Sequence, residues 1–311
     1  MGVIYISGYG RSGSTYLDLL LGQHSAIASG GEVVNLTSLL AKGGGKCSCG
    51  YVFKECPVWG GIIKETSDRV RLKETSWQQL NNASRVRDIF GSYFLFKLWK
   101  TISFDRNRCS EEQCSIYNRS LFALNKKNQD ANFIIDSSKT SYSSLFRPFI
   151  LSRDLDEPVI MVHLVRHPYS VIASIKKGTN KALASGDKKQ RKFKVLRGFI
   201  GWMIANTAAL LNDKLVKEPS VVIHYESLIN KPKEEITKIT ALLGLKPDEI
   251  IEFLDGQKAQ LPAHLCEGNR MGKGELKIAG NASVPIPTLK EKVYYFIFCS
   301  WLQLLLKRKC G

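Results

Sequence analysis

The chain has 311 residues, 44% of them hydrophobic, which suits one large α/β domain or two small ones with a real core. Its 45 lysines and arginines exceed its 28 aspartates and glutamates, and the net charge of +17 favours anionic partners such as a phosphorylated cofactor, nucleic acid, anionic lipid or an acidic polymer. No uninterrupted apolar run reaches the roughly 18–20 residues of a membrane span, which excludes a spanning helix.

A glycine-rich loop follows a short apolar run near the start of the chain and leads into an apolar helix. Glycines let backbone N–H groups converge on an anion, and the helix N-terminus attracts negative charge. The spacing Gly8-x4-Gly13-x-Thr15 is close to that of a nucleotide P-loop, but Ser14 replaces the lysine and the basic residue, Arg11, lies inside the loop. The pattern predicts a phosphate cradle that does not hold ATP and Mg²⁺ in the usual way, with an ordinary strand-to-helix turn as the alternative.

Glu32 follows two glycines within a short extended segment, 27–34. The glycines predict a tight turn that places the carboxylate, and few other charges lie near it in the sequence. A lone glutamate is usually solvated or sits at a helix N-terminus. Its position shortly after the glycine loop makes Glu32 a candidate general base.

Three cysteines, Cys47, Cys49 and Cys56, fall within ten residues. A closed zinc site needs four ligands, and Cys109 or Cys114 could supply the fourth only through the fold. The alternatives are a cysteine-rich structural loop and a local disulfide, so zinc binding and a disulfide both stay open. Because no export signal is visible, we expect most of the eight cysteines to be reduced and the protein to be cytoplasmic.

Residues from about 76 to 127 are predicted to be helical in pieces. Ile89, Phe90 and Leu98 belong to a set of apolar positions that recur at three- and four-residue steps, as on one helix face. Together with the cysteine-containing segment, these pieces form a predicted insertion at about 40–130. We expect this insertion to cap the site and to select the acceptor.

Three further apolar runs are predicted to be buried strands, at 132–136, 158–165 and 220–225. A predicted helix at 233–243 has Gly244 as its C-cap. Strands that alternate with helices favour a parallel sheet with helices on both faces, in which ligands gather at the carboxyl ends of the strands. Four side chains directly follow predicted strand ends, and we expect them to form one anion pocket: Arg11, Lys139, Arg166 and Tyr225.

The final third of the chain carries a basic loop and an apolar segment. Residues 264–274 interleave glycines with Arg270 and Lys273, which predicts either a mobile loop that closes over a phosphate or a solvated surface loop. Residues 293–306 are rich in aromatics and leucine and precede the basic run 307–309. They are predicted to form a C-terminal core helix, with contact to a membrane surface as the lesser alternative.

Together, these motifs resemble the sulfotransferases that use 3′-phosphoadenosine 5′-phosphosulfate (PAPS), in particular their bacterial and carbohydrate-type branch. The resemblance spans most of the chain, and its anchors come in the expected order. They are the 5′-phosphosulfate loop at 10–15, the 3′-phosphate motif at 165–168 with Ser174, the adenine segment at 224–228 and a late loop at 268–271. The cysteine segments 47–50 and 56–59 also look like those of bacterial members. The ordered pair of phosphate motifs, with its spacing from Arg166 to Ser174, is the specific part.

The resemblance implies which residues bind the cofactor. The residues implied to cradle the 5′-phosphate and the bridging oxygen are Gly10, Arg11, Ser12, Gly13, Ser14 and Thr15. Arg166 and Ser174 are implied to bind the 3′-phosphate, with Arg270 or Lys273 as helpers. Tyr225 is implied to pack near the adenine.

The resemblance also implies catalytic roles. Glu32 matches the Gly-Glu setting of the base in the protein-tyrosine type of sulfotransferase, and His264 is a second candidate base. Lys139 matches a lysine near the transferring group and would stabilise charge on the leaving oxygen, together with Arg11. Such transfer rests on positioning and charge neutralisation, so no metal is expected to be required.

The fold implied is the P-loop-like sulfotransferase fold, a three-layer α/β/α arrangement with a central parallel sheet and helical insertions in a single domain, 1–311. The implied acceptor is a hydroxyl of a carbohydrate or small metabolite, and the positive charge favours an acidic glycan. One alternative is a small-molecule kinase using Mg-ATP, for which Asp136 is the obvious strand-end carboxylate. The other is a basic nucleic-acid or glycan-binding protein, although no nucleic acid is expected because the basic residues are dispersed.

Overall fold

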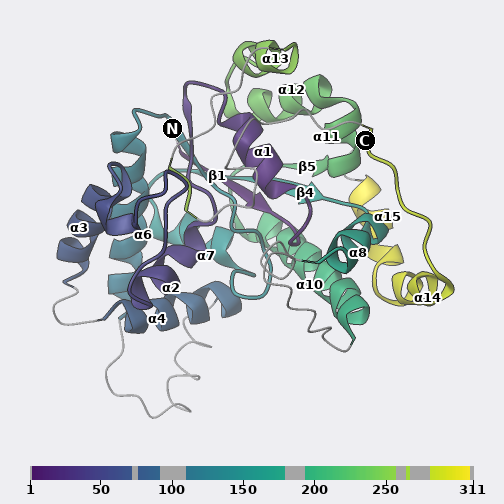
Figure 1. Ribbon diagram of the computed structural model, residues 1–311, viewed down its shortest axis with the longest axis horizontal. Coiled ribbons are helices and arrows are strands. Elements are labelled where there is room, and N and C mark those ends of the chain that lie inside the picture. Colours follow the sequence, from purple (N-terminus) through teal and green to yellow (C-terminus); the bar gives the residue numbers. More distant parts are fainter. Residues whose placement is uncertain are drawn as a thin grey trace.

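The computed structural model describes residues 2–71, 76–91, 110–178, 193–256, 264–266 and 281–308. Within these residues, five parallel strands form one central sheet in the order β2-β3-β1-β4-β5 (Figure 1). The strands are β1 (Gly2–Ser7), β2 (Ile27–Ser29), β3 (Phe133–Asp136), β4 (Val159–Val165) and β5 (Ser220–His224). Each of the runs predicted at 132–136, 158–165 and 220–225 is confirmed to within one residue at either end.

Strand β1 lies at the centre of the sheet, and its mostly apolar sequence fits that position. Every residue of β1 is buried, because the strand is paired on both edges and covered on both faces, which is typical of parallel strands. Val3 lies opposite Ile134 of β3 and opposite Val159 of β4. The carboxyl ends of these three strands therefore meet at one edge of the sheet.

Helices alternate with the strands along most of the chain. In chain order they are α1 (Ser14–Leu21), the 3₁₀ helix η1 (Val33–Asn35), α2 (Leu36–Ala41), the 3₁₀ helix η2 (Phe53–Glu55), α3 (Trp59–Val70), α4 (Trp77–Phe90), α6 (Glu111–Asn128), α7 (Arg147–Asp154), α8 (Pro168–Lys176), α10 (Lys194–Leu215), α11 (Tyr225–Asn230), α12 (Pro232–Leu243), α13 (Asp248–Leu254), α14 (Leu289–Phe298) and α15 (Ser300–Arg308). Residues at several helix ends explain where those helices begin and stop. Ser110 and Gln113 form a capping box at the start of α6, and Gly244, with a φ of 67°, ends α12 as predicted.

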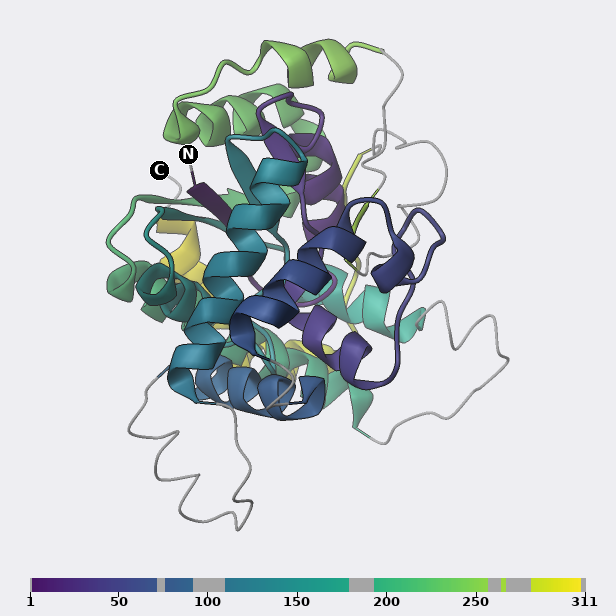
Figure 2. The same ribbon diagram turned by 90° about the vertical axis from the view of Figure 1, so that its left-hand side faces the viewer.

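The two faces of the sheet carry different helices. Val3 and Tyr5 belong to a core that includes α3, α4 and α6, whereas Ile4 and Ile6 point to the opposite face, against α1 and α12. Figure 1 shows the two groups on either side of the strands, and Figure 2, which looks at the molecule from the left of Figure 1, shows the blue helices α3 and α4 in front. The predicted three-layer α/β/α arrangement is therefore confirmed.

The helical insertion differs in detail from its prediction. Helix α4 buries Leu80, Ala83 and Val86, while Phe90 is 41% exposed. Gly91 ends the helix with a φ of 65°, so the apolar face predicted to run through Ile89 and Phe90 to Leu98 is interrupted there. Leu98 itself lies outside the described residues, and so does Cys109.

The C-terminal segment was predicted to be one core helix, and this is wrong in two respects. The segment is broken at Cys299 into α14 and α15, and only one side of it is buried. Leu302 and Leu306 pack in a core with α10, whereas Phe296 is 76% exposed and Leu304 is 63% exposed. Among the helices that the structure describes, none is long and apolar enough to cross a bilayer.

Candidate functional site

The loops after β1 and β3 are bonded to each other at the carboxyl edge of the sheet. Thr140 accepts a hydrogen bond from the Gly8 amide through its Oγ1 at 3.0 Å and donates its own amide to the Gly8 carbonyl at 3.1 Å. The Lys139 amide donates to the carbonyl of Ile6. The segment that carries Lys139 therefore fixes the start of the glycine loop by hydrogen bonds. Both lie at the carboxyl edge of the sheet, where parallel sheets bind ligands.

The glycine loop has the backbone geometry of an anion cradle. Gly8, Arg11 and Gly13 all have positive φ, at 122°, 73° and 93°, and α1 begins directly afterwards at Ser14. The first N–H groups of a helix have no partner within it and point out of its N-terminus. A Cβ at Gly13 would lie 2.4 Å from the ring of Tyr225, so only glycine fits there.

Arg166 joins this loop to the end of β5. Its guanidinium donates to the carbonyl of Arg11 at 2.9 Å and lies 4.2 Å from the centre of the Tyr225 ring. Trp202 of α10 donates its indole N–H to the carbonyl of Arg166 and fixes the backbone. The structure therefore brings together three of the four predicted strand-end residues, Arg11, Arg166 and Tyr225, in one cluster.

Three buried polar atoms at this edge do not form hydrogen bonds with the described part of the protein. Ser7 Oγ, Arg166 Nε and Ser170 Oγ are buried and have no hydrogen-bond partner within the part of the chain that is described. Ser170 lies in the first turn of α8, and Ser174, half-buried, lies one turn further on. Unpaired buried donors are costly unless a ligand completes them, so this donor set fits an anionic ligand.

Glu32 and Lys139 form an ion pair. Asn35 donates its side-chain amide to the second carboxylate oxygen of Glu32 at 3.2 Å. Lys139 is 11% exposed and Glu32 is 29% exposed, so water and small molecules can reach the pair. The fourth strand-end residue, Lys139, thus directly contacts the predicted base.

The turn that carries Glu32 is held by a short segment from far along the chain. The Glu32 amide donates to the carbonyl of Cys266 at 2.7 Å, and the Cys266 amide donates to the carbonyl of Gly30 at 2.9 Å. Gly31 has a φ of 75°, and a Cβ there would lie 2.5 Å from the Cys266 carbonyl oxygen. The two glycines are therefore required by the turn, as the sequence suggests.

Asp136, at the end of β3, belongs to a buried ion network. Arg147 donates to Asp136 at 2.9 Å and to Asp88 at 3.0 Å, and all three side chains are at most 2% exposed. The other carboxylate oxygen of Asp136 accepts hydrogen bonds from the amide and hydroxyl of Ser138. Both oxygens of this carboxylate are bonded to protein groups, so it is not available to a metal ion.

Burial shifts the pKa of groups beside the site. Asp18 of α1 is fully buried, and desolvation raises its pKa to about 7. Burial also lowers the pKa of His167, whose backbone amide donates to Glu226 at 3.1 Å. Both effects disfavour charge, so at neutral pH His167 is mostly uncharged and Asp18 is partly protonated.

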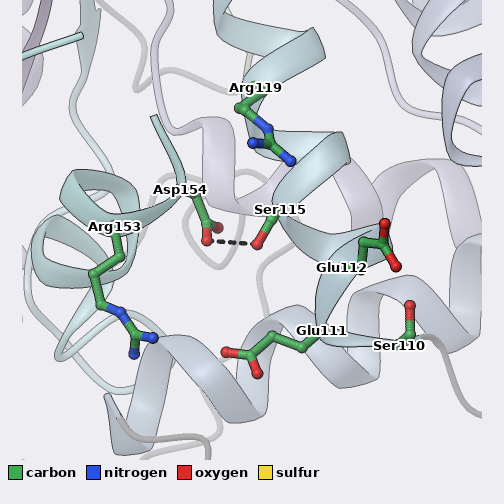
Figure 3. Close-up of a pocket in the computed structure, with 7 residues that line it drawn as sticks. All are labelled: Ser110, Glu111, Glu112, Ser115, Arg119, Arg153 and Asp154. Atoms are coloured by element: carbon green, nitrogen blue, oxygen red, sulfur yellow. Dashed lines mark hydrogen bonds between the residues drawn. The ribbon is translucent and has the colours of Figure 1, made fainter. Parts of the chain in front are cut away.

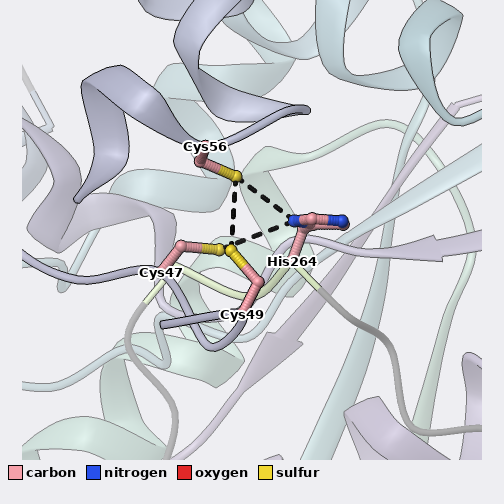
Figure 4. A group of neighbouring side chains, drawn as sticks. All are labelled: Cys47, Cys49, Cys56 and His264. Carbon is pink, nitrogen blue, oxygen red and sulfur yellow. Dashed lines mark hydrogen bonds between the residues drawn. The ribbon is translucent and has the colours of Figure 1, made fainter. Parts of the chain in front are cut away.

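His264, predicted as a second candidate base, lies among the cysteines (Figure 4). Its Nδ1 is 3.2 Å from Cys56 Sγ and 3.9 Å from Cys47 Sγ. Cys49 Sγ is 3.7 Å from Cys56 Sγ, and all described cysteines are free thiols. Cys114 is buried elsewhere, against Ser84. The open question of a fourth partner for the three cysteines is answered by a histidine.

Two predicted residues, Arg270 and Lys273, lie outside the described residues. Three others that the structure brings to the site were not predicted to be there: Thr140, Asn35 and Ser7. Thr140 directly follows Lys139, and Asn35 lies one helical step after Glu32. Their positions next to predicted site residues were the only signal in the sequence.

A polar pocket of about 580 Å³ lies elsewhere, between the start of α6 and the end of α7 (Figure 3). Asp154 in its wall accepts hydrogen bonds from Ser115, Asn118 and Arg87. Asp154 is the last residue of α7, and none of the residues that line the pocket comes from the glycine loop or from the loop after β3. It is lined by a structural ion network and does not belong to the candidate site.

Comparisons with solved structures find sulfotransferases. A sulfotransferase domain from the curacin biosynthetic pathway is 18% identical, with a TM-score of 0.48 over 95% of this chain and 96% of that chain. A sulfotransferase domain from the Synechococcus PCC 7002 olefin synthase is 18% identical, with a TM-score of 0.44 over 95% and 93%. A sulfotransferase from Mycobacterium avium is 11% identical, with a TM-score of 0.47 over 97% and 76%.

No protein-family model matches the chain, and no curated protein sequence matches it either.

Proposed function

We propose that this chain is a sulfotransferase that moves a sulfuryl group from PAPS to a hydroxyl of an acceptor. The observation that carries the proposal is the contact between Arg166 and the glycine loop, in which the Arg166 guanidinium bonds to the carbonyl of Arg11. It joins the two segments that resemble the 5′- and 3′-phosphate motifs. A loop without the P-loop lysine, combined with a second arginine from the neighbouring strand end, suits a donor that carries phosphate at two positions.

Residues of the cluster have distinct tasks in binding. The loop amides and the N-terminus of α1 hold one phosphate, and Arg11 adds a positive charge beside it. Arg166, with Ser174 of α8, holds the other phosphate, and the orphaned Ser170 hydroxyl is an additional donor there. Tyr225 offers an aromatic face next to Arg166 for the adenine.

When bound, PAPS supplies the sulfuryl group on its 5′-phosphate. Glu32 accepts the proton of the acceptor hydroxyl, and Asn35 orients the carboxylate through its second oxygen. Lys139 lies against Glu32 and supplies positive charge where negative charge develops on the leaving oxygen. Positioning and charge neutralisation by these residues account for the reaction without a catalytic metal.

The kinase alternative is weakened by Asp136. A Mg-ATP enzyme needs a carboxylate free to hold the ion, and in the described part of the chain Asp136 is buried and bonded to Arg147 and Ser138. We therefore keep the sulfotransferase as the single proposed function. The acceptor is proposed to be a carbohydrate or small metabolite, with the insertion at about 40–130 capping the site where it binds.

Calorimetric titration with 3′-phosphoadenosine 5′-phosphate, the product form of the donor, tests the proposal. We expect tight binding without Mg²⁺ and no binding of Mg-ATP. Arg166→Ala should lower the affinity roughly 10- to 100-fold, the size of one or two charge-assisted hydrogen bonds.

The matched control is Arg153→Ala, which removes an exposed arginine of α7 outside the candidate site and should leave the affinity unchanged. Binding of Mg-ATP alone would contradict the proposal, and so would an affinity that does not respond to Arg166→Ala.

A further inference from the structure

Four potential metal ligands converge between two segments that are distant in sequence. Cys47, Cys49 and Cys56 come from the loop before α3, and His264 comes from the described segment 264–266 (Figure 4). Their ligand atoms, three sulfurs and one imidazole nitrogen, all lie within 4.8 Å of one another. This is a closed set of four donors around one point.

The separations fit a tetrahedral zinc ion. With Zn–S near 2.3 Å and Zn–N near 2.0 Å, tetrahedral geometry places ligand sulfurs about 3.8 Å apart and sulfur and nitrogen about 3.5 Å apart. The observed distances are 3.7 Å for Cys49 to Cys56, and 3.2 Å and 3.9 Å from His264 Nδ1 to Cys56 and Cys47. Three thiolates and an imidazole form one of the ligand sets of structural zinc, and soft sulfur donors disfavour Mg²⁺ and Ca²⁺.

Neighbouring groups orient these ligands as in built metal sites. The Trp59 amide donates to Cys56 Sγ at 3.4 Å and fixes the direction of this thiol. The Trp59 indole donates to the His264 carbonyl at 2.9 Å, and the Leu265 amide donates to Ser48 Oγ at 2.7 Å. Such outer partners fix the ligands and are part of metal-site design.

A disulfide fits this arrangement less well. A bridge joins two sulfurs at about 2.05 Å and would leave the third thiol and the imidazole without a role. In the structure, the three sulfurs are disposed around the imidazole nitrogen, and none of the described cysteines is bridged. The arrangement is that of a coordination sphere.

We infer that Cys47, Cys49, Cys56 and His264 bind one structural zinc ion that fixes the turn carrying Glu32. Binding releases the protons of three thiols, and the neutral imidazole binds through Nδ1. All four positions are filled by protein, so the ion has no open site for catalysis. Its effect passes through the segment 264–266, since Cys266 is bonded to both Gly30 and Glu32.

Metal analysis of the purified full-length chain tests the binding. Protein prepared under reducing conditions and supplied with zinc should carry about one zinc per chain by elemental analysis and native mass spectrometry. Replacement of zinc by Co²⁺ should give thiolate-to-cobalt charge-transfer absorption and the visible bands of a tetrahedral site. Cys56→Ser and His264→Ala should lose the metal or bind it at least 10-fold more weakly, because each removes one ligand.

Cys299→Ser is the matched control, since Cys299 is a buried free thiol between α14 and α15, and this variant should keep its zinc. If the ligand variants fail to fold, titration of the wild-type chain with a zinc chelator still decides the matter. Folded wild-type protein that takes up no zinc or cobalt would overturn the proposal, as would metal binding that survives both ligand substitutions.

Hydrogen exchange tests the link to Glu32 without relying on activity. Removal of zinc from the wild-type chain should speed exchange of the Glu32 and Leu265 amides at least 10-fold, while amides of β1 and β4 stay protected. Equal protection with and without zinc would show that the ion does not position the turn. Because neither experiment involves PAPS, their outcome is separate from that of the proposed sulfotransferase.

Discussion

Two ion clusters include residues close together in sequence, Asp136 at the end of β3 and Lys139 just after it, and they differ in burial. Asp136 pairs with Arg147 at 0% and 2% exposure, and Arg147 also bonds to Asp88. Lys139 pairs with Glu32 at 11% and 29% exposure. The first cluster is sealed inside the protein, whereas the second opens to solvent beside the glycine loop.

This difference in exposure indicates that the buried cluster stabilises the fold, whereas the exposed pair is able to react with a ligand. A buried pair cannot exchange partners without leaving an uncompensated charge in a medium of low dielectric constant, so its role is to fix the fold. A partly exposed pair can open to admit a ligand at a lower cost than a buried one, because water reaches the separated charges. Substitutions at the two clusters should therefore affect different measurements.

Glu32→Gln should have the largest effect on turnover. The amide cannot take a proton, so we expect kcat to fall by roughly 10²- to 10⁴-fold, the usual contribution of a general base. Conversion of PAPS to 3′-phosphoadenosine 5′-phosphate with a panel of hydroxyl compounds measures this. Affinity for the product nucleotide should change less than about threefold, and Glu65→Gln, on the exposed surface of α3, is the control. A near-normal kcat would move the base to another residue.

Arg147→Ala should instead act on stability. It leaves the Asp88 and Asp136 carboxylates buried and unpaired, which costs about 3–5 kcal/mol of the free energy of unfolding. The midpoint of urea denaturation measures this loss. The control is Arg69→Ala, because Arg69 pairs with Glu65 at about half exposure and its removal should change little. If both arginine variants were equally stable, the buried cluster would not have the structural role assigned to it.

Asp18→Asn should give the smallest effect and one that depends on pH. Because burial raises the Asp18 pKa to about 7, the folded protein keeps this proton where the unfolded chain has lost it. Stability from this group is therefore full below about pH 4 and declines as pH rises towards 7.

The Asn variant does not titrate, so its advantage over the wild type should grow from near zero at pH 4 to about 1–4 kcal/mol at pH 8. Thermal or urea unfolding across this range measures the difference, with the exposed Asp68→Asn as the control for loss of one charge. A stability difference that is constant with pH would show that folding does not raise the pKa of Asp18.

Most of the sheet and the glycine loop could be predicted because their signals are local. An apolar run, positive-φ glycines and a helix start lie within 20 residues at the N-terminus, and Gly244 ends α12 for a local steric reason. The pairing of Glu32 with Lys139 was not predicted, although both residues were singled out. It depends on how β2 and β3 lie side by side, which no short pattern encodes.

The histidine among the cysteines could not be read from spacing at all. Cys56 and His264 are 208 residues apart, and the sequence around His264 was equally compatible with a base in a phosphate-binding loop. The prediction of one core helix at the C-terminus was wrong for a different reason. Its apolar content suggested burial, but only the side that faces α10 is covered, because no further layer of the described structure lies over Phe296 and Leu304.

The short segment 264–266 also constrains the order in which the molecule can be completed. It bonds to Gly30, Glu32 and Ser48, and the contact of Ser48 with Leu265 spans 217 of the 311 residues. During synthesis, the turn that carries Glu32 cannot form its hydrogen bonds to Cys266 until most of the chain has been made. Contacts of such sequence separation form slowly, because a long loop must close first. The geometry around Glu32 is therefore a late product of folding, and a chain truncated before residue 264 would lack it.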